Sequence, residues 1–252
     1  MTLHELPAPQ STPPGGRPPA PRHADGPLCP APPGGSAPSR VPRARGRRAA
    51  RLLDIIVAGS ALAVLSPLLA AIAVLVRRSS RGPALFRQQR LGRHRQPFVM
   101  LKFRTMHVDS DDQRHREYVR RLLAEPAEST RTAEGLYKLT GDPRVTRTGR
   151  WLRTTSLDEL PQLVNVLRGE MALVGPRPVL PWEADLFDPR HAARFEVRPG
   201  ITGLWQTSGR NRLTMTEALD LDVQYAERAS LRLDLQILLR TIPVVIRREG
   251  VR

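Results

Sequence analysis

Residues 154–163 read TTSLDELPQL, and the rest of the chain is organised around this stretch. It places two adjacent carboxylates, Asp158 and Glu159, in a chain that is otherwise rich in arginine. Apolar residues then recur at helical spacing as far as Gly169, a residue type that commonly ends helices. This pattern predicts a helix over residues 157–168 with the two acids at its start.

The start of this helix has two interpretations that the stretch alone leaves open. In the structural one, Ser156 and Glu159 form a capping box. Asp158 could equally cap the helix, which places Pro161 in the tolerated first turn. In the chemical one, the two acids have different tasks, because consecutive helical residues point about 100° apart. One carboxylate then attacks as a nucleophile while the other binds Mg²⁺, and Arg153 binds phosphate through its guanidinium.

The overall composition points to an anionic partner. The chain has 252 residues, with 40 Lys and Arg against 24 Asp and Glu and a formal net charge of +16. Such an excess is typical of proteins that bind nucleic acid, an anionic membrane surface or a phosphate-bearing substrate. No nucleic-acid-binding motif or aromatic platform is present, so nucleic acid is not an expected partner. The single cysteine, Cys29, excludes an internal disulfide and a thiol-rich metal site.

Residues 1–46 are predicted to be a disordered tail rich in proline and arginine. Residues 1–50 hold 13 of the 25 prolines and show no hydrophobic period, so they cannot bury enough apolar surface to fold. The tail ends in a run of arginines next to an apolar segment. These arginines are expected to bind anionic lipid, at about 1 kcal/mol for each charge near the surface, and a solvated linker is the alternative.

Residues 47–81 are predicted to be a membrane helix, because Ile55–Val76 is free of charged side chains over 22 residues. A straight helix of this length would be about 33 Å long, enough for a bilayer core of about 30 Å. Ser66 and Pro67 lie at its middle. Proline removes one backbone hydrogen bond and so kinks or breaks the helix, and the Ser66 hydroxyl could bind the carbonyl that is freed.

Both ends of this segment carry arginine, so the distribution of positive charge gives no preferred orientation across a membrane. A re-entrant helix that enters the membrane, turns at the Ser66-Pro67 pair and returns would leave both ends in the cytoplasm. We therefore favour a re-entrant helix over a spanning one, followed by a cytoplasmic catalytic domain over residues 82–252.

The segment after the membrane helix offers candidate phosphate ligands. Residues 98–106 alternate from Leu101 onward, which predicts a half-buried strand with Lys102 and Arg104 on one face. Two cations two residues apart could bind a diphosphate, and two solvated cations are the alternative.

Two turns further along the chain present more arginines. Prolines on both sides of Arg177 fix the backbone and so aim its guanidinium. Arg198 begins a segment whose glycines, among them Gly200 and Gly203, would permit the close backbone approach that phosphate loops require. Residues 231–246 are predicted to be a second apolar helix, too short and too charged to span, which is typical of a helix at a membrane interface.

A series of short motifs follows in order along the chain, from about residue 47 to residue 248. They are Arg51-x-x-Asp54 with Ser66-Pro67, Gly82-Pro83 with Phe86-x-Gln88-x-Arg90-x-Gly92, Lys102-Phe103-Arg104-Thr105-Met106, Asp142-Pro143-Arg144-Val145-Thr146, Leu152-Arg153-x-x-Ser156-Leu157-Asp158-Glu159-Leu160-Pro161-Gln162, Gly175-Pro176-Arg177-Pro178, Arg198-Pro199-Gly200-Ile201-Thr202-Gly203 and Leu233-Asp234-Leu235. On these residues the chain resembles the bacterial sugar transferases, the polyprenyl-phosphate phosphoglycosyl transferases of the monotopic type.

The resemblance implies a membrane-associated α+β fold. It would consist of one re-entrant helix broken at the Ser66-Pro67 pair, interfacial amphipathic helices and a small cytoplasmic catalytic body. The resemblance also implies that Asp158 is the nucleophile and that Glu159 binds Mg²⁺. The basic side chains that it places near the phosphosugar or the lipid phosphate are Lys102, Arg104, Arg153 and Arg177.

The activity that the resemblance implies is phosphosugar transfer. The enzyme would move a sugar-1-phosphate from a UDP-sugar to polyprenyl (undecaprenyl) phosphate and release UMP, through a covalent phosphosugar intermediate on Asp158. This would be the first membrane step of polysaccharide or glycoconjugate synthesis, at the cell inner membrane. A non-catalytic membrane-anchored protein that binds anionic lipid or nucleic acid is the alternative, and a homo-oligomer is left open.

Overall fold

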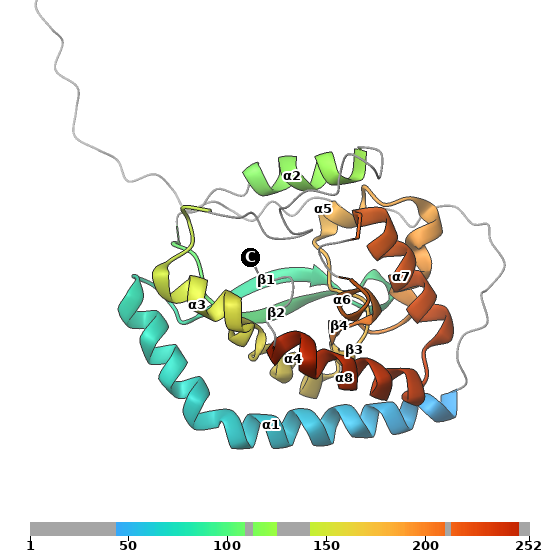
Figure 1. Ribbon diagram of the computed structural model, residues 1–252, viewed down its shortest axis with the longest axis horizontal. Coiled ribbons are helices and arrows are strands. Elements are labelled where there is room, and N and C mark those ends of the chain that lie inside the picture. The colour runs from blue at the N-terminus through green and yellow to red at the C-terminus, as the bar shows by residue number, and fades with distance from the viewer. Residues whose placement is uncertain (1–43, 109–112, 125–141, 210–212, 247–252) are drawn as a thin grey trace, which may run out of the picture. The chain divides into compact units, whose positions relative to one another are not determined.

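The computed structural model describes residues 44–108, 113–124, 142–209 and 213–246. The disorder predicted for residues 1–46 concerns a tail that lies, up to residue 43, outside the described residues. The described residues combine helices with two small sheets (Figure 1), which confirms the mixed helix-and-sheet class that the sequence predicts.

The longest element is α1, which runs from Ala44 to Ser79, contains Pro67 and is visibly bent in Figure 1. Pro67 has no N–H to donate to the carbonyl of Ala63, four residues earlier. The Ser66 hydroxyl donates to that carbonyl at 2.9 Å, so the hydrogen bond expected of this side chain is formed. The helix is long and apolar enough to cross a membrane, by length and composition.

Polar side chains in the first turns of α1 fasten it to the rest of the fold. Arg51 donates to the carbonyls of Val166 and Leu167 at 2.6 and 2.9 Å, and Asp54 accepts from the Leu173 N–H at 3.0 Å. Both side chains bind backbone groups far along the chain, and together they form what we call the helix seat.

Two short sheets build the frame beside α1. β1 (Leu85–Leu91) pairs antiparallel with β2 (Pro97–Phe103), and η1 (Arg93–Arg95) joins them. β3 (Ala172–Val174) pairs in parallel with β4 (Gly200–Thr202). The second pairing brings two distant turns together, one after β3 and one before β4.

Helices surround these sheets. They are α2 (Gln113–Ala124), α3 (Arg147–Thr155), η2 (Leu157–Glu159), α4 (Gln162–Arg168), α5 (Pro181–Ala184), η3 (Pro189–Glu196), α6 (Leu204–Thr207), α7 (Met215–Arg228) and α8 (Leu231–Ile246). The helix predicted over residues 157–168 is divided into η2 and α4. Pro161, which has no N–H to continue a helix, lies between them, and α4 begins at the next residue, Gln162. Gly169 ends α4 with φ 82°, as the sequence predicts.

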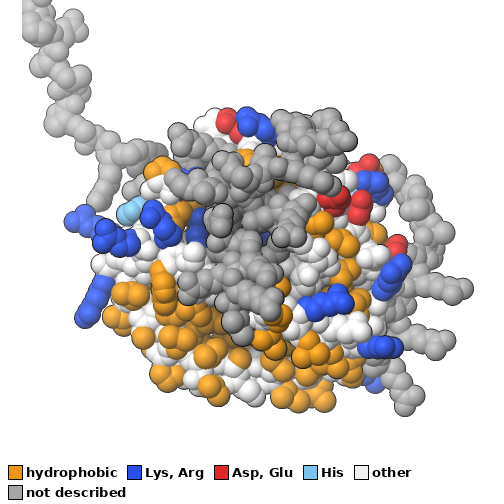
Figure 2. Space-filling model, viewed as in Figure 1, with side chains coloured by type: hydrophobic (Ala, Val, Ile, Leu, Met, Phe, Trp, Pro, Cys, Tyr) orange, Lys and Arg blue, Asp and Glu red, His pale blue; other side chains and the backbone are white. Residues whose placement is uncertain are grey.

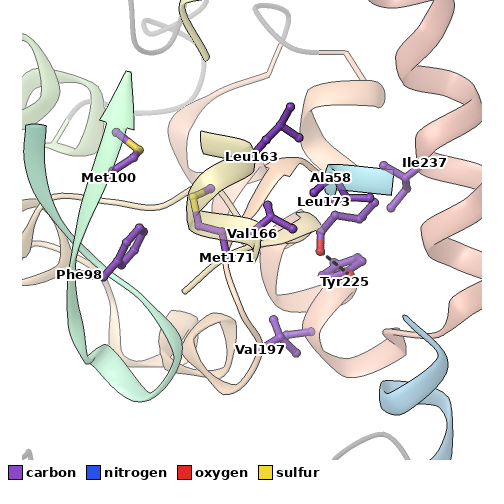
Figure 3. Close-up of a cluster of buried hydrophobic side chains, with 12 residues drawn as sticks. Ala58, Phe98, Met100, Leu163, Val166, Met171, Leu173, Val197, Tyr225 and Ile237 are labelled. Atoms are coloured by element: carbon purple, nitrogen blue, oxygen red, sulfur yellow. Dashed lines mark hydrogen bonds between the residues drawn. The ribbon is translucent and has the colours of Figure 1, made fainter. Parts of the chain in front are cut away.

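The main core joins α1 to the sheets and to the last two helices (Figure 3). Ala58 of α1 and Ile237 of α8 are fully buried in it. The Tyr225 hydroxyl oxygen on α7 lies 3.0 Å from the carbonyl oxygen of Val174, so α7 packs against the end of β3. One end of the apolar helix is therefore part of the same core as the frame.

Large apolar side chains remain exposed along α1 and α8. Figure 2 shows hydrophobic side chains gathered along the lower part of the view, where Figure 1 draws these two helices. The exposed residues are Leu52, Ile55, Ile56, Val57, Val64, Leu68, Val74 and Leu75 on α1, and Leu235, Leu239 and Ile242 on α8. The bounds of α8 agree with the predicted interfacial helix over residues 231–246.

Candidate active site

The two adjacent acids lie on η2, the turn of 3₁₀ helix between α3 and α4. Ser156 before them is left-handed (φ 55°), and its side chain forms no capping hydrogen bond. The capping box with Glu159 is therefore not formed, and α4 begins after Asp158 rather than at it. Neither predicted cap is therefore formed, although both acids still lie in the first turn of a helix, η2.

Glu159 is the point at which three segments meet. Its Oε1 lies 3.2 Å from Lys102 Nζ on β2 and 3.8 Å from Arg177 Nη1 in the turn after β3. Burial lowers the pKa of Lys102, and the Glu159 carboxylate is the largest influence that opposes this shift. The fold thus brings two of the predicted cations to one of the predicted carboxylates.

Asp158 is 5% exposed and has its own cationic neighbour in Arg153, in the last turn of α3. Burial lowers the pKa of Arg153, and the charge of Asp158 is the largest influence that opposes this shift. The Arg153 guanidinium donates from Nε to Thr105 Oγ1 at 3.1 Å. Thr105 was not singled out from the sequence, although it lies in the Lys102 motif. We call the acids and their three cations, Lys102, Arg153 and Arg177, the carboxylate site.

Arg104 lies elsewhere, although it is only two residues from Lys102. β2 ends at Phe103, so the alternation that would place the two cations on one face stops before Arg104. Its guanidinium donates to the carbonyls of Arg81 and Ser80 at 2.6 and 2.8 Å, just beyond the end of α1. Cations stabilise the carbonyl end of a helix. In this structure the Arg104 guanidinium is thus committed to the end of α1, and its binding of substrate beside Lys102 stays a prediction.

Arg198 lines a cavity of about 360 Å³ together with Arg51, Asp54 and Asp234. Neither acid of the carboxylate site lines that cavity. The expectation that Arg198 binds the substrate stays a prediction.

The glycines after Arg198 serve the packing of the backbone. A Cβ added to Gly200 would collide with the backbone N of Gly175, and one added to Gly203 would collide with the carbonyl O of Gly175. The close backbone approach that these glycines permit is made by Gly175, in the turn after β3, to the two ends of β4. A close approach to a phosphate at this place stays a prediction.

Comparison with known proteins gives the chain a family. It matches the model described as "Bacterial sugar transferase" over residues 45–248. It is 42% identical over 205 residues to the "Exopolysaccharide production protein ExoY" of Rhizobium meliloti (strain 1021), which covers 81% of this chain and 88% of that protein.

Two further relatives carry names that state a reaction. The chain is 42% identical over 204 residues to the "UDP-glucose:undecaprenyl-phosphate glucose-1-phosphate transferase" of Caulobacter vibrioides, covering 78% of this chain and 69% of that protein. It is 40% identical over 200 residues to the "Undecaprenyl-phosphate galactose phosphotransferase" of Salmonella typhimurium, covering 79% of this chain but 41% of that protein. With a family match over most of its length, this chain belongs to the bacterial sugar transferase family and is an enzyme of the transferase class.

Proposed function

We propose that the enzyme transfers a sugar-1-phosphate from a UDP-sugar to polyprenyl phosphate and releases UMP, as the first membrane step in the synthesis of a polysaccharide or glycoconjugate. One observation carries this proposal: a buried Asp158 lies next to Glu159, on which Lys102 and Arg177 converge. Acids among cations suit a reaction that handles a negatively charged diphosphate. The names of the relatives supply the donor and acceptor classes.

In the proposed reaction Asp158 is the nucleophile. A carboxylate oxygen of Asp158 attacks the phosphorus that bears the sugar, and the bond from that phosphorus to the UMP oxygen breaks. A phosphate oxygen of the polyprenyl phosphate then attacks the same phosphorus and releases the Asp158 carboxylate, which leaves a polyprenyl diphosphate sugar. A direct transfer with both substrates bound would use the same charged groups without the covalent step.

The three cations of the carboxylate site would bind the phosphates. Lys102 and Arg177 approach from the side of Glu159, and Arg153 from the side of Asp158. Positive groups fixed before the reaction stabilise the charge that develops on the transferring phosphoryl group. Binding of a diphosphate would give the partly buried ammonium of Lys102 further anionic partners.

Mg²⁺ is the metal that fits this set of residues. The part of the chain that the structure describes holds no group of three or more Asp, Glu, His or Cys side chains that could bind a metal without a substrate. Mg²⁺ commonly binds through one or two carboxylates and the phosphates of a substrate. Glu159 would hold it, and the bound ion would neutralise part of the diphosphate charge.

We also propose that the exposed apolar face of α1 and α8 lies in the inner membrane, with the body on the cytoplasmic side. A lipid-linked acceptor is confined to the bilayer, which explains why the carboxylate site is joined to an apolar helix. We retain the re-entrant course of α1, because its bend and its Ser66 hydrogen bond fit a helix that turns within the membrane.

The course of α1 can be tested with single cysteines placed at Ala49 and at Ser79 in a Cys29→Ser background. Both should react with a membrane-impermeant maleimide from the cytoplasmic side alone, in inverted vesicles but not in intact spheroplasts. Labelling of the two positions from opposite sides would show that α1 spans the membrane.

The reaction can be tested by the nucleotide that the purified enzyme releases. Detergent-solubilised protein would be given Mg²⁺, polyprenyl phosphate and a panel of UDP-sugars. Release of UMP with one sugar supports phosphosugar transfer and identifies the donor. Release of UDP would mean that the sugar moves without its phosphate, and the role proposed for Asp158 would be wrong.

A further inference from the structure

The turn Pro176-Arg177-Pro178 has an unusual set of contacts: each of its three consecutive carbonyls accepts a hydrogen bond from a different segment of the chain. The donors, in order, are Gly200 N–H to Pro176 O at 2.9 Å, Arg194 Nη2 to Arg177 O at 2.8 Å and Arg90 Nη1 to Pro178 O at 3.2 Å. Two of the three residues are prolines and have no N–H, so the carbonyls are the main polar groups by which this turn can be held.

Arg194 on η3 is built into the interior to make its bond. It is 3% exposed, and the same Nη2 lies 2.7 Å from Asp222 Oδ2 on α7, which is 2% exposed. Its guanidinium lies over the rings of Phe187 and Phe195, 5.4 and 5.2 Å from their centroids. A buried arginine held by a carboxylate, two rings and a carbonyl has little freedom to move.

The carbonyl that Arg194 binds belongs to the residue whose side chain reaches Glu159. Pro178 restricts the residue before it to extended backbone conformations, so Arg177 has only a narrow range of backbone angles. The hydrogen bond from Arg194 to the Arg177 carbonyl holds the peptide plane between Arg177 and Pro178 within that range. A donor fixed at this carbonyl therefore limits where the Arg177 guanidinium can point.

We propose that Arg194, held by Asp222, is a positioning residue that aims Arg177 at Glu159 and at the phosphate bound there. This inference rests on the proposed phosphosugar transfer. Misplacing a phosphate-binding group by about 1 Å can cost about 10²-fold in rate, so a loose Arg177 should slow the reaction markedly. Neither Arg194 nor Asp222 needs to touch substrate for this to hold.

The test is a double-mutant cycle on UMP release with Arg194→Lys and Arg177→Ala. Arg194→Lys alone should lower kcat about 10-fold, with KM for the UDP-sugar changed less than about 3-fold. In the Arg177→Ala background the same substitution should lower kcat less than about 2-fold, because there is no longer a guanidinium to aim. An equal loss in both backgrounds would overturn the proposal and assign Arg194 a general structural role.

Arg95→Lys is the matched control. Arg95 also lies over the Phe195 ring, at 5.3 Å, and it binds the carbonyl of Ala184 and the carboxylate of Asp185 rather than the Pro-Arg-Pro turn. It should keep kcat within about 2-fold of the wild type. A loss in Arg95→Lys equal to that in Arg194→Lys would show that any disturbance near Phe195 slows the enzyme, and would contradict the proposal.

If Arg194→Lys does not fold, the same cycle with Asp222→Asn decides the question. Asparagine keeps an oxygen to accept from Arg194 and removes the charge that holds the guanidinium. The wild type separates the two hypotheses: without UMP release the proposed function fails, whereas an active wild type whose Arg194 and Asp222 variants show no coupling to Arg177 overturns this inference alone.

Discussion

The carboxylate site and the attachments of α1 use the same residue types in opposite ways. At the carboxylate site, the cations Lys102 and Arg177 face the carboxylate of Glu159. Where α1 meets the body, Arg51 at one end and Arg104 at the other bind backbone carbonyls that end helices. A backbone carbonyl at a helix end keeps its arginine whether or not substrate is bound. A carboxylate that faces several cations can instead release them to a bound phosphate and take a metal ion in their place. The comparison predicts that charges in the first region control the rate and charges in the second control stability.

The largest effect should come from Asp158→Asn. An amide has no negative charge with which to attack phosphorus, so UMP release should fall by about 10³-fold or more. The melting temperature should change little, because the substitution keeps the shape of the side chain. Both quantities would be measured on detergent-solubilised protein.

Asp220→Asn is the control for this substitution, since Asp220 is half exposed and pairs with His191 at 2.9 Å, away from the carboxylate site. It should keep its activity. Retention of full transfer activity by Asp158→Asn would show that another group attacks the phosphorus. The expectation that the acids of the carboxylate site control the rate would then be wrong for Asp158.

Lys102→Met should lower kcat by about 10²-fold, because it removes a positive group from the transferring phosphate. Lys102→Arg should retain more activity and extend it to higher pH. Burial lowers the pKa of Lys102, so the ammonium loses its charge as pH rises through that value, whereas a guanidinium stays charged. A pH profile of kcat whose alkaline limb is the same in wild type and Lys102→Arg would contradict this assignment.

Arg104→Met should have the reverse effect. The substitution leaves the carbonyls of Ser80 and Arg81 without their donor, which should cost about 2 kcal/mol and lower the melting temperature. The rate per folded molecule should stay within about 2-fold, since the guanidinium does not reach Glu159. Arg87→Met, at an exposed position on β1, is the control and should change neither quantity. A large loss of kcat at an unchanged melting temperature would show that Arg104 acts on the substrate rather than on the stability of the fold.

The sequence predicted those features that depend on local pattern. Residues 231–246 form the helix whose bounds the apolar run indicated, and Gly169 ends α4 where a glycine was expected to end it. The Ser66 hydroxyl binds the carbonyl that Pro67 leaves without a donor. In each case the signal and the structure lie within one or two helical turns, so no knowledge of distant segments was needed.

The sequence failed where the partner lies far along the chain. Arg104 continues an alternation that ends with β2 at Phe103, and only the fold brings the end of α1 to its guanidinium. Gly200 packs against Gly175, a contact set by the pairing of β3 with β4. Arg194 was not predicted from the sequence for the same reason: the carbonyl that it binds belongs to Arg177, and nothing near Arg194 in the sequence indicates this contact.

The smallest effect concerns Asp234, on the cavity beside the helix seat. Burial raises its pKa to about 6; the hydrogen bond from the Tyr225 hydroxyl at 2.7 Å opposes this rise, and the like charge of Asp54 adds to it. The folded state thus holds this proton more tightly than the unfolded chain, whose value is near 3.8. Stability should therefore fall as pH rises from about 4 to about 6 and remain lowered above that range.

Asp234→Asn should raise the melting temperature at pH 7 by a few degrees, corresponding to about 1 kcal/mol, because it removes a charge that is costly to bury. The difference from the wild type should shrink as pH falls and vanish below about pH 3, where the wild-type carboxyl is protonated in both states. Asparagine still offers an oxygen to Tyr225, so UMP release should be unchanged. A lower melting temperature at pH 7 would show that the charged hydrogen bond between Tyr225 and Asp234 outweighs the cost of burying the charge.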